Sequence, residues 1–188
     1  EILVWTDNSL YSLQYIGAPY TFGVTQIASN ITTTGYNCFV SVDDTVMWMG
    51  KNKFYVYSGQ TNELKCTVLN HVFTDINFNQ SDKIMGALNS EFNEVTWFYV
   101  SLSNLNGNST PDSYVTYNYV ERVWTYGNLA RTGWLDRGTR NYPTAAATDG
   151  YLYYHEKGVD DGSTTPPSPL NAYIESAPIE IGDGDKFS

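Results

Sequence analysis

The chain has 188 residues and a formal charge of −10 at pH 7. This length gives one domain with a sizeable core, or part of a larger domain. The acidic balance excludes a surface built to wrap nucleic acid tightly, because that affinity comes from neutralising phosphates with Lys and Arg. Sixteen Tyr, eight Phe and five Trp favour strands over helices, so we expect an all-β protein.

The first predicted element is a hairpin over residues 4–13, in which Asp7-Asn8-Ser9 supplies the turn. In a later hairpin, Asp149-Gly150 is the clearest hairpin turn of the sequence. The strand–turn–strand pattern of residues 4–13 returns three times, over residues 40–48, 87–99 and 145–153.

A second hairpin is predicted after each of the later copies. Residues 53–57 pair with 63–68, and residues 114–119 pair with 123–126 across a turn at Glu121-Arg122. Residues 172–176 and 179–181 begin a third such hairpin. Units of four antiparallel strands that recur about every 40 to 50 residues are typical of a β-propeller. We therefore predict a β-propeller-like array of four-stranded antiparallel blades, with a two-sheet β-sandwich as the alternative.

The array is expected to be incomplete, because three or four blades do not close a ring of the usual size. The chain also starts directly in an apolar strand-like run and stops at a turn, as expected for a piece of a longer protein. We divide it into propeller-like blades at 1–157, a Pro-rich connector without regular strands at 158–169, and the start of a further β element at 170–188.

Two segments between the strands have other patterns. Residues 101–113 are polar and form a surface loop inserted within a blade. Residues 70–80 carry apolar side chains at 72, 73 and 76, which indicates one short helix. No window approaches the roughly 18 consecutive apolar residues of a membrane span, so we predict none.

Groups for catalysis are scarce. His71 and His155 are the only histidines, and we assign a catalytic role to neither. Cys38 and Cys66 are expected to be reduced thiols, with a disulfide as the alternative. Neighbouring carboxylates such as Asp43-Asp44 are expected by chance in so acidic a chain. We therefore predict no enzyme, no catalytic residues, no metal site and no cofactor.

The segment from Arg131 to Tyr142 carries three of the four arginines of the chain. Arg and aromatic residues are enriched at protein interfaces, and Arg makes bidentate contacts with carboxylates. We predict a contact between blades or between subunits here, with a solvated loop and a phosphate site as alternatives. The interface candidates are Arg131, Trp134, Arg137, Arg140 and Tyr142.

The stretch "YNYVERVWTYG" at 117–127 places four aromatic side chains around a polar centre. Such a stretch could grip a ligand or form one hairpin of a larger repeat. Since the pattern recurs, we interpret it as the outer hairpin of a repeating unit. Tyr and Trp bury a large area while one polar atom reaches a partner, so these rings are expected to pack between sheets.

Several stretches, in this order and over nearly the whole chain, resemble tail proteins of short-tailed bacteriophages, in the tail-nozzle or packaged-DNA stabilisation family. These stretches are "ILVWTDNSLYSLQYIGAPYTFG" at 2–23, "MWMGKNKFYVYSG" at 47–59, "FNEVTWFYV" at 92–100, "YNYVERVWTYG" at 117–127, "RTGWLDRGTRNYP" at 131–143 and "YIESAPIEIGDG" at 173–184.

The resemblance implies a structural protein of the virion tail, assembled in the host cytoplasm, with a β-propeller-like body. It implies a homo-oligomeric ring, commonly of six subunits, that contacts other tail or adaptor proteins, retains the packaged DNA and lets it pass on ejection. It implies no catalytic residues. Two other functions remain open: a carbohydrate-binding or glycan-hydrolysing β-propeller, and an adhesion module for a host surface.

Overall fold

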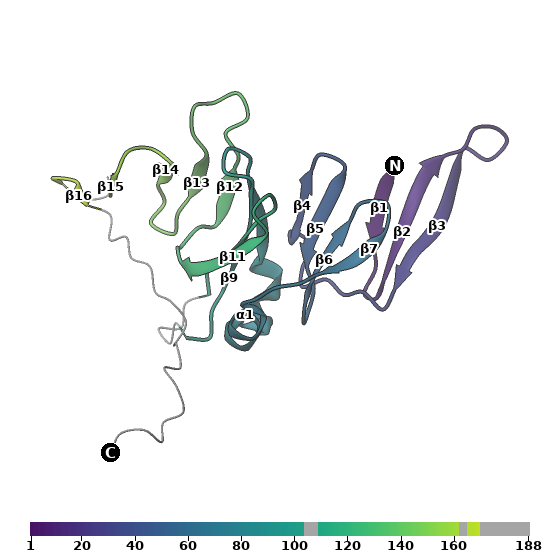
Figure 1. The fold of residues 1–188 in the computed structure, drawn as a ribbon, viewed down its shortest axis with the longest axis horizontal. Coiled ribbons are helices and arrows are strands. Elements are labelled where there is room, and N and C mark those ends of the chain that lie inside the picture. The colour runs from purple at the N-terminus through teal and green to yellow at the C-terminus, as the bar shows by residue number, and fades with distance from the viewer. Residues whose placement is uncertain (104–108, 162–164, 170–188) are drawn as a thin grey trace, which may run out of the picture. The chain divides into compact units, whose positions relative to one another are not determined.

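The computed structural model describes residues 1–103, 109–161 and 165–169, which fall into two compact units, 1–156 and 157–188. The first unit contains four antiparallel sheets that follow one another along the chain (Figure 1). Sheet 1 consists of β1 (Ile2–Trp5), β2 (Ser9–Tyr15) and β3 (Phe22–Ser29), and sheet 2 of β4 (Phe39–Val42), β5 (Thr45–Met49), β6 (Phe54–Tyr57) and β7 (Thr61–Leu64). Sheet 3 consists of β8 (Met85–Asn89), β9 (Glu94–Tyr99), β10 (Ser113–Asn118) and β11 (Val123–Asn128), and sheet 4 of β12 (Gly133–Leu135), β13 (Thr144–Ala146) and β14 (Leu152–Tyr154).

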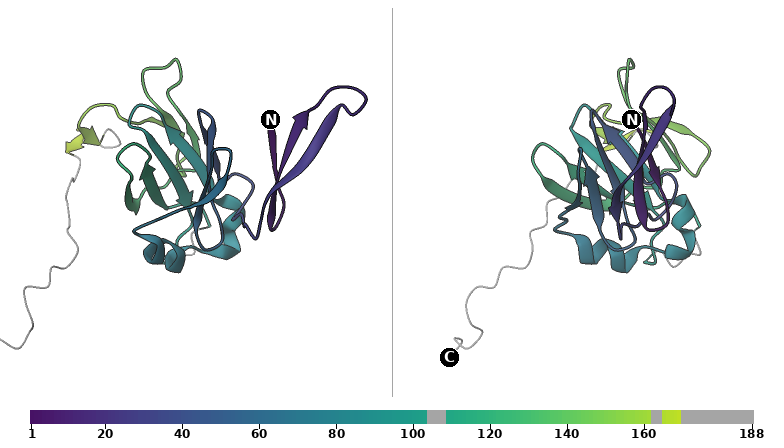
Figure 2. Two further views of the ribbon diagram at one scale, coloured as in Figure 1. Left: turned by 45° about the vertical axis from the view of Figure 1, so that its right-hand side comes forward. Right: turned by 90° about the vertical axis from the view of Figure 1, so that its right-hand side faces the viewer.

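Two short helical elements connect sheets 2 and 3. Helix α1 spans Leu69–Asp75 and is followed by the 3-10 segment η1, Phe78–Lys83. Val72 is the fully buried residue of α1 and belongs to the main core. The predicted helix within 70–80 is thereby confirmed, and Figure 2 shows both elements at one edge of the sheets.

Polar side chains close the hairpins. In the β10–β11 hairpin, Asn118 Oδ1 accepts hydrogen bonds from the backbone N–H groups of Val120, at 3.1 Å, and Glu121, at 2.8 Å. Arg122 then adopts a left-handed conformation, with φ of 59°. Tyr117 and Trp124 form a directly opposed pair in this hairpin and both are buried. The stretch 117–127 is therefore a hairpin, as predicted, and its two central rings pack inside the protein. Tyr126 is 50% exposed, so the expectation that its ring packs between sheets is wrong.

Aromatic contacts join each sheet to the next. The Trp5 ring lies 4.3 Å from that of Phe39, which joins sheet 1 to sheet 2. Phe54 of sheet 2 lies 4.9 Å from Trp97 of sheet 3. Trp134 of sheet 4 lies 6.0 Å from Phe98 of sheet 3. The sheets therefore form one stack, in the order 1, 2, 3, 4.

Indole N–H groups add hydrogen bonds across two of these contacts. Trp97 donates to the carbonyl of Cys38 at 2.8 Å, and Trp124 to that of Lys65 at 2.9 Å, both from sheet 3 to residues flanking sheet 2. Trp134 donates from sheet 4 to the carbonyl of Leu88 in sheet 3 at 2.8 Å. The buried indole nitrogen of Trp5 has no partner in the described chain. The first sheet therefore joins sheet 2 without an indole hydrogen bond, through ring packing and the hydrogen bond that the Tyr57 hydroxyl donates to Glu1 at 3.1 Å.

The first strands of successive sheets lie beside one another. β4 contacts β8, and β8 contacts β12. The backbone N–H of Gly86 donates to Asn37 at 2.7 Å beside a parallel bridge between Asn37 and Met85. A Cβ on Gly86 would lie 2.4 Å from a methyl group of Val40, so only glycine permits this close approach.

The all-β prediction is confirmed, but the strand count needs correction. Sheets 2 and 3 have four strands each, as predicted for a blade, whereas sheets 1 and 4 have three strands each. β3 and β12 were not predicted. β3 follows β2 across a turn that includes Gly17 and Pro19, and this turn lacks the polar residues that mark the predicted hairpins. β12 is only three residues long, which is too short to show an alternating pattern.

The second unit is described only in part. β15 (Asp160–Asp161) pairs with β16 (Ser168–Pro169) as a two-residue antiparallel ladder. The expectation that 158–169 holds no regular strand is therefore wrong, because so short a ladder needs few backbone donors and tolerates nearby prolines. The hairpin predicted over 172–181 lies outside the described residues. No helix in the described part of the chain is both long and apolar enough to cross a membrane.

Both cysteines are free thiols. Cys38 is buried and its Sγ donates to the carbonyl of Gly35 at 3.0 Å. Burial raises the pKa of the Cys38 thiol, and it raises that of Cys66 to about 11. Both groups are therefore protonated at neutral pH, which makes them weak nucleophiles.

Substitution of Trp97 and Trp5 tests the indole hydrogen bonds. Trp97→Phe removes the bond to Cys38 and leaves that carbonyl with only a 3.4 Å contact from the Met49 N–H. Trp5→Phe removes a donor that has no partner. We expect Trp97→Phe to lower the free energy of unfolding by about 1 kcal/mol more than Trp5→Phe, as measured by urea denaturation. Equal losses would contradict a stabilising role for the bond.

Candidate functional site

The predicted interface segment lies along the contact between sheets 3 and 4. Trp134, on β12, donates its indole N–H to Leu88 and packs its ring against Phe98. The ring of His155 lies on it as well, with the ring centres 4.8 Å apart. Trp134 therefore fills the space between the two sheets, as an inter-sheet residue of this chain.

Arg131 holds the end of β14 in place. Its Nε donates to Nε2 of His155 at 2.9 Å, and its guanidinium lies 5.0 Å from the centre of the Tyr153 ring. Burial and the positive charge of Arg131 lower the pKa of His155 to about 4. His155 is therefore neutral at pH 7, and its Nε2 lone pair is already used as an acceptor.

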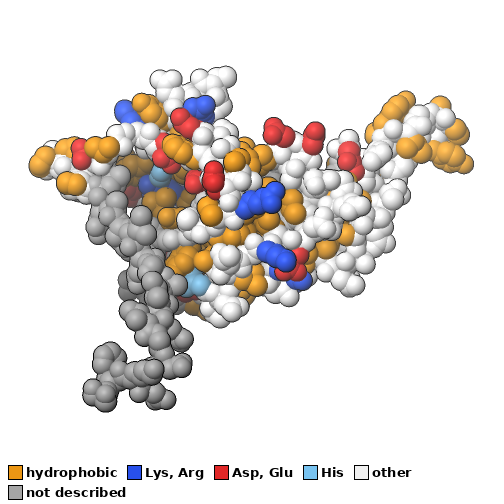
Figure 3. Space-filling model, viewed as in Figure 1, with side chains coloured by type: hydrophobic (Ala, Val, Ile, Leu, Met, Phe, Trp, Pro, Cys, Tyr) orange, Lys and Arg blue, Asp and Glu red, His pale blue; other side chains and the backbone are white. Residues whose placement is uncertain are grey.

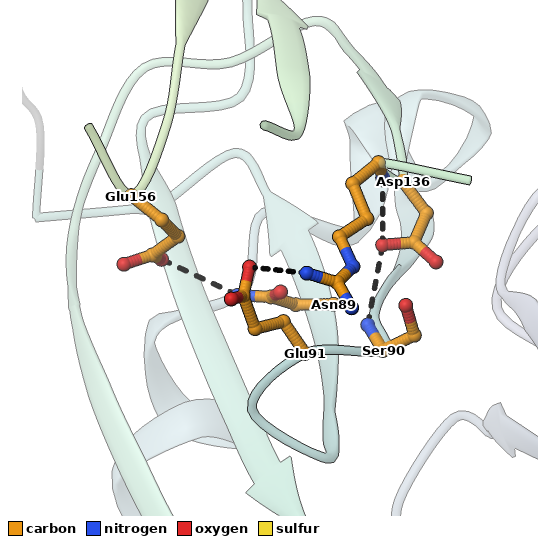
Figure 4. A network of polar contacts seen from close by, with 6 residues as sticks. Asn89, Ser90, Glu91, Asp136 and Glu156 are labelled. Carbon is orange, nitrogen blue, oxygen red and sulfur yellow. Dashed lines mark hydrogen bonds and ion pairs between the residues drawn. The ribbon is translucent and has the colours of Figure 1, made fainter. Parts of the chain in front are cut away.

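A polar network, of which Figure 4 shows Ser90, Glu91 and Asp136, joins the β8–β9 turn to the segment after β12, and Arg137 belongs to it. Its guanidinium pairs with Glu91 at 3.1 Å, where both side chains are partly exposed. Asp136 Oδ1 accepts from the backbone N–H of Ser90 at 3.2 Å and from that of Arg137 at 2.8 Å. The β8–β9 turn is thereby tied to the segment that follows β12.

Arg140 and Tyr142 lie away from these contacts. Arg140 is exposed, and its backbone N–H closes a turn by donating to the carbonyl of Arg137 at 2.7 Å. Tyr142 is half-buried, with its ring edge-on to Tyr154 at 6.2 Å. Of the five interface candidates, Trp134 and Arg137 thus contact sheet 3, Arg131 and Tyr142 contact β14 or the residue that follows it, and the Arg140 side chain is exposed.

A small cavity of about 150 Å³ lies beside Trp134 between the two sheets. Glu94 and Glu156 line it, together with the amide of Asn89. Burial, and then the charge of Glu156, raise the pKa of Glu94. Asn89 donates to Glu156 at 3.3 Å, while its own carbonyl oxygen is buried without a partner in the described chain. The cavity therefore gathers hydrogen-bond acceptors around two carboxylates.

This pair of carboxylates was not predicted, because Glu94 and Glu156 lie far apart in the sequence and meet only when sheet 4 folds onto sheet 3. Within the described ranges, no group of three or more His, Cys, Asp or Glu side chains is placed to hold a metal ion.

The outer face of sheet 1 is apolar and exposed. The strand register places Ile2, Leu13 and Val24 side by side, and Tyr15 opposite Phe22, so all five point to one side. Tyr15 is 72% exposed and Val24 67%. The other face of the sheet packs on the core through Leu3, Trp5 and Leu10. Figure 3 shows hydrophobic side chains gathered at the tip of the β2–β3 hairpin.

Sheet 4 has an exposed apolar outer face at the opposite end of the stack. Trp134 and its cross-strand partners Ala145 and Tyr153 share the other face, which Trp134 turns toward sheet 3. Leu152 and Tyr154 point outward and are 73% and 62% exposed. We call these two surfaces, the outer faces of β1–β3 and of β12–β14, the end faces of the stack.

Comparison of the sequence with models of known protein families gives no match, and comparison with curated proteins gives none either.

Removal of the Arg131 side chain tests the environment of His155. Arg131→Ala takes away a positive charge and the donor to Nε2, so protonation of His155 becomes easier. We expect the pKa of His155, followed by NMR titration, to rise from about 4 toward 6.5. The variant Arg140→Ala removes an exposed arginine and serves as the control. An unchanged titration in Arg131→Ala would contradict the assigned contact.

Substitution of Glu94 tests the partly buried carboxylate. Because its pKa is raised on folding, its ionisation costs stability at pH 7, and this cost disappears as pH falls below the ordinary value of 4.5. Glu94→Gln should therefore raise the free energy of unfolding at pH 7 and lose this advantage near pH 4. Glu121→Gln, at an exposed turn, controls for the removal of one charge from an acidic protein. A gain of equal size in both variants would show that net charge alone is responsible.

Proposed function

We propose that this chain is part of a structural protein of a phage virion tail, which assembles as a ring, retains packaged DNA and forms part of its exit channel. The observation that carries the proposal is the stack of sheets with an exposed apolar face at each end. Every inner face of the stack is covered by a neighbouring sheet. The end faces are apolar, like the covered faces between sheets 1, 2 and 3, so they fit contact with another sheet.

The proposal includes a propeller-like arrangement of the four sheets as blades. In a propeller, the first strand of each blade lies nearest the common axis, and successive blades cover one another. Two features support this arrangement: the contacts of β4 with β8 and of β8 with β12, and the close approach of backbones at Gly86. The three-stranded sheets 1 and 4 are then the terminal blades of an open array.

The two end faces differ from each other, and this favours a head-to-tail contact. Sheet 1 presents Ile2, Tyr15 and Val24, whereas sheet 4 presents Leu152 and Tyr154. When two different surfaces of one chain bind each other, the assembly is a ring if the rotation closes. Burial of one such side chain contributes about 1.5 to 3 kcal/mol before the cost of association. Burial of several such side chains together therefore favours assembly.

The charge of the chain also fits a conduit for DNA. A wall with a formal charge of −10 repels phosphates, so a passing duplex does not adhere to it. No catalytic residue takes part in such a function.

A glycan-hydrolysing propeller is the second candidate, and Glu94 with Glu156 is the observation in its favour, because paired carboxylates perform that chemistry. Their cavity of about 150 Å³ is smaller than the roughly 300 to 1,000 Å³ typical of ligand pockets. We therefore rank assembly first.

Charge substitutions on the end faces test the assembly. We expect the chain to form oligomers whose mass rises with concentration in size-exclusion chromatography with light scattering, and rings in electron micrographs. Val24→Lys and Leu152→Lys each place a charge on one end face, so each variant alone should be monomeric. A mixture of the two should stop at dimers, because each variant retains one intact face.

Thr25→Lys is the matched control, because Thr25 is exposed on the opposite side of β3 from Val24. This variant should assemble like the unmodified chain, and circular dichroism should confirm that all three variants fold. A chain that remains monomeric at every concentration would overturn the proposal. Homodimers of Val24→Lys would instead indicate a symmetric contact between two copies of sheet 4.

A further inference from the structure

A second and larger cavity, of about 320 Å³, lies between α1 and sheet 3. His71 and Asp75 come from α1, one helical turn apart and thus on one side of the helix. Tyr99 ends β9, Ser113 begins β10, and Tyr126 and Asn128 lie on β11. The strand pairing brings Tyr99 opposite Ser113 and Ser113 opposite Asn128. These six side chains therefore converge from one helix and three adjacent strands.

One wall of this cavity is aromatic. The imidazole of His71 lies over the ring of Tyr126, with 4.0 Å between the ring centres and 34° between the planes. Tyr126 is half-exposed, unlike its buried neighbour Trp124 in the same strand. The two rings thus cover one face of each other, and together they form an aromatic side wall of the cavity.

The floor of the cavity holds an unused hydroxyl group. Tyr99 is 1% exposed, yet its hydroxyl makes no hydrogen bond with any described residue. Burial raises the pKa of this phenol, and the nearby charges of Asp75 and Asp112 raise it further, so it is a protonated donor. The hydroxyl is therefore available to donate a hydrogen bond to a ligand bound in the cavity.

Asp75 supplies an acceptor in a fixed position. Its carboxylate Oδ1 accepts the backbone N–H of Ser103 at 2.9 Å, and its backbone carbonyl accepts that of Leu102 at 2.6 Å. These contacts hold the end of α1 against the segment that follows β9. The carboxylate therefore faces the cavity without a large loss of side-chain freedom on binding.

The charge of the cavity selects its ligand. Among the described residues that line it, none is Lys or Arg, and Asp75 is the one carboxylate. An anionic ligand would be repelled, and hydrolysis by paired carboxylates lacks its second group. A neutral ring with hydroxyl groups fits, because its C–H face can lie on the aromatic wall while its hydroxyls bond to Asp75, Tyr99 and Ser113.

We propose that this cavity binds one neutral monosaccharide unit, free or at the end of a glycan. Its volume is at the lower end of the range for ligand sites, which fits a single ring better than a chain of sugars. The proposal is independent of ring assembly, because the lining residues belong to α1 and the middle of the stack.

The test is binding of D-glucose, D-galactose, D-mannose and N-acetylglucosamine to the full chain, followed by NMR chemical shifts up to tens of millimolar sugar. We expect saturable binding of at least one sugar, with shifts at Tyr99 and Tyr126. Tyr99→Phe removes only the hydroxyl and should weaken binding about three- to tenfold. Tyr126→Ala removes the aromatic surface and should weaken binding about tenfold.

Tyr36→Ala is the control, because Tyr36 is exposed and does not line this cavity. Its affinity should equal that of the unmodified chain. Tyr99→Phe should unfold at the same urea concentration as the unmodified chain, since its hydroxyl has no partner to lose. Absence of binding by all four sugars would overturn the proposal. So would binding that neither variant weakens, or a preference for sialic acid over the neutral sugars.

Discussion

The structure depends on one constraint: a sheet of three or four short strands cannot bury its faces alone. Sheet 2 solves this by packing Trp48 toward sheet 1 and Phe54 toward sheet 3. Large rings suit the task because each one spans much of the space between sheets. The indole N–H of Trp97 then fixes the position of one sheet on the next through a backbone carbonyl. The high aromatic content of the chain follows from this architecture.

The contact between sheets 3 and 4 has a different chemistry. One face of sheet 3 carries Val95 and Trp97 toward sheet 2, whereas the other carries Glu94 and Thr96, whose hydroxyl lies 2.7 Å from that of Thr116. Sheet 4 is held on this polar face mainly by Trp134 and by charged and polar side chains. Because such contacts bury less apolar area, sheet 4 is expected to open before the core of sheets 2 and 3.

Hairpins with a short-range sequence pattern were predictable. Contacts between distant segments were not, because the sequence carries no local pattern for them. The turn at Asp149-Gly150 and the paired aromatic strands of 114–126 have short-range patterns, and both hairpins form as expected. β12 has no such pattern, because its three residues become a strand only by pairing with β13. Arg131 was predicted at an interface from composition, but its partner His155 is 24 residues away and is chosen by the packing of sheet 4.

The end faces and the sugar cavity occupy different parts of the stack, and this separation matters for both proposals. Sheet 3, which supplies Tyr99 and Tyr126, is covered on both sides by other sheets, so contacts at the ends of the stack leave its edge beside α1 untouched. A lysine at Val24 or Leu152 should therefore disrupt assembly without changing sugar affinity, and Tyr126→Ala should do the reverse. Val24 and Leu152 are exposed on the end faces, whereas Tyr126 borders the cavity beside α1. The same chain can therefore assemble through its end faces and bind a ligand in a separate site.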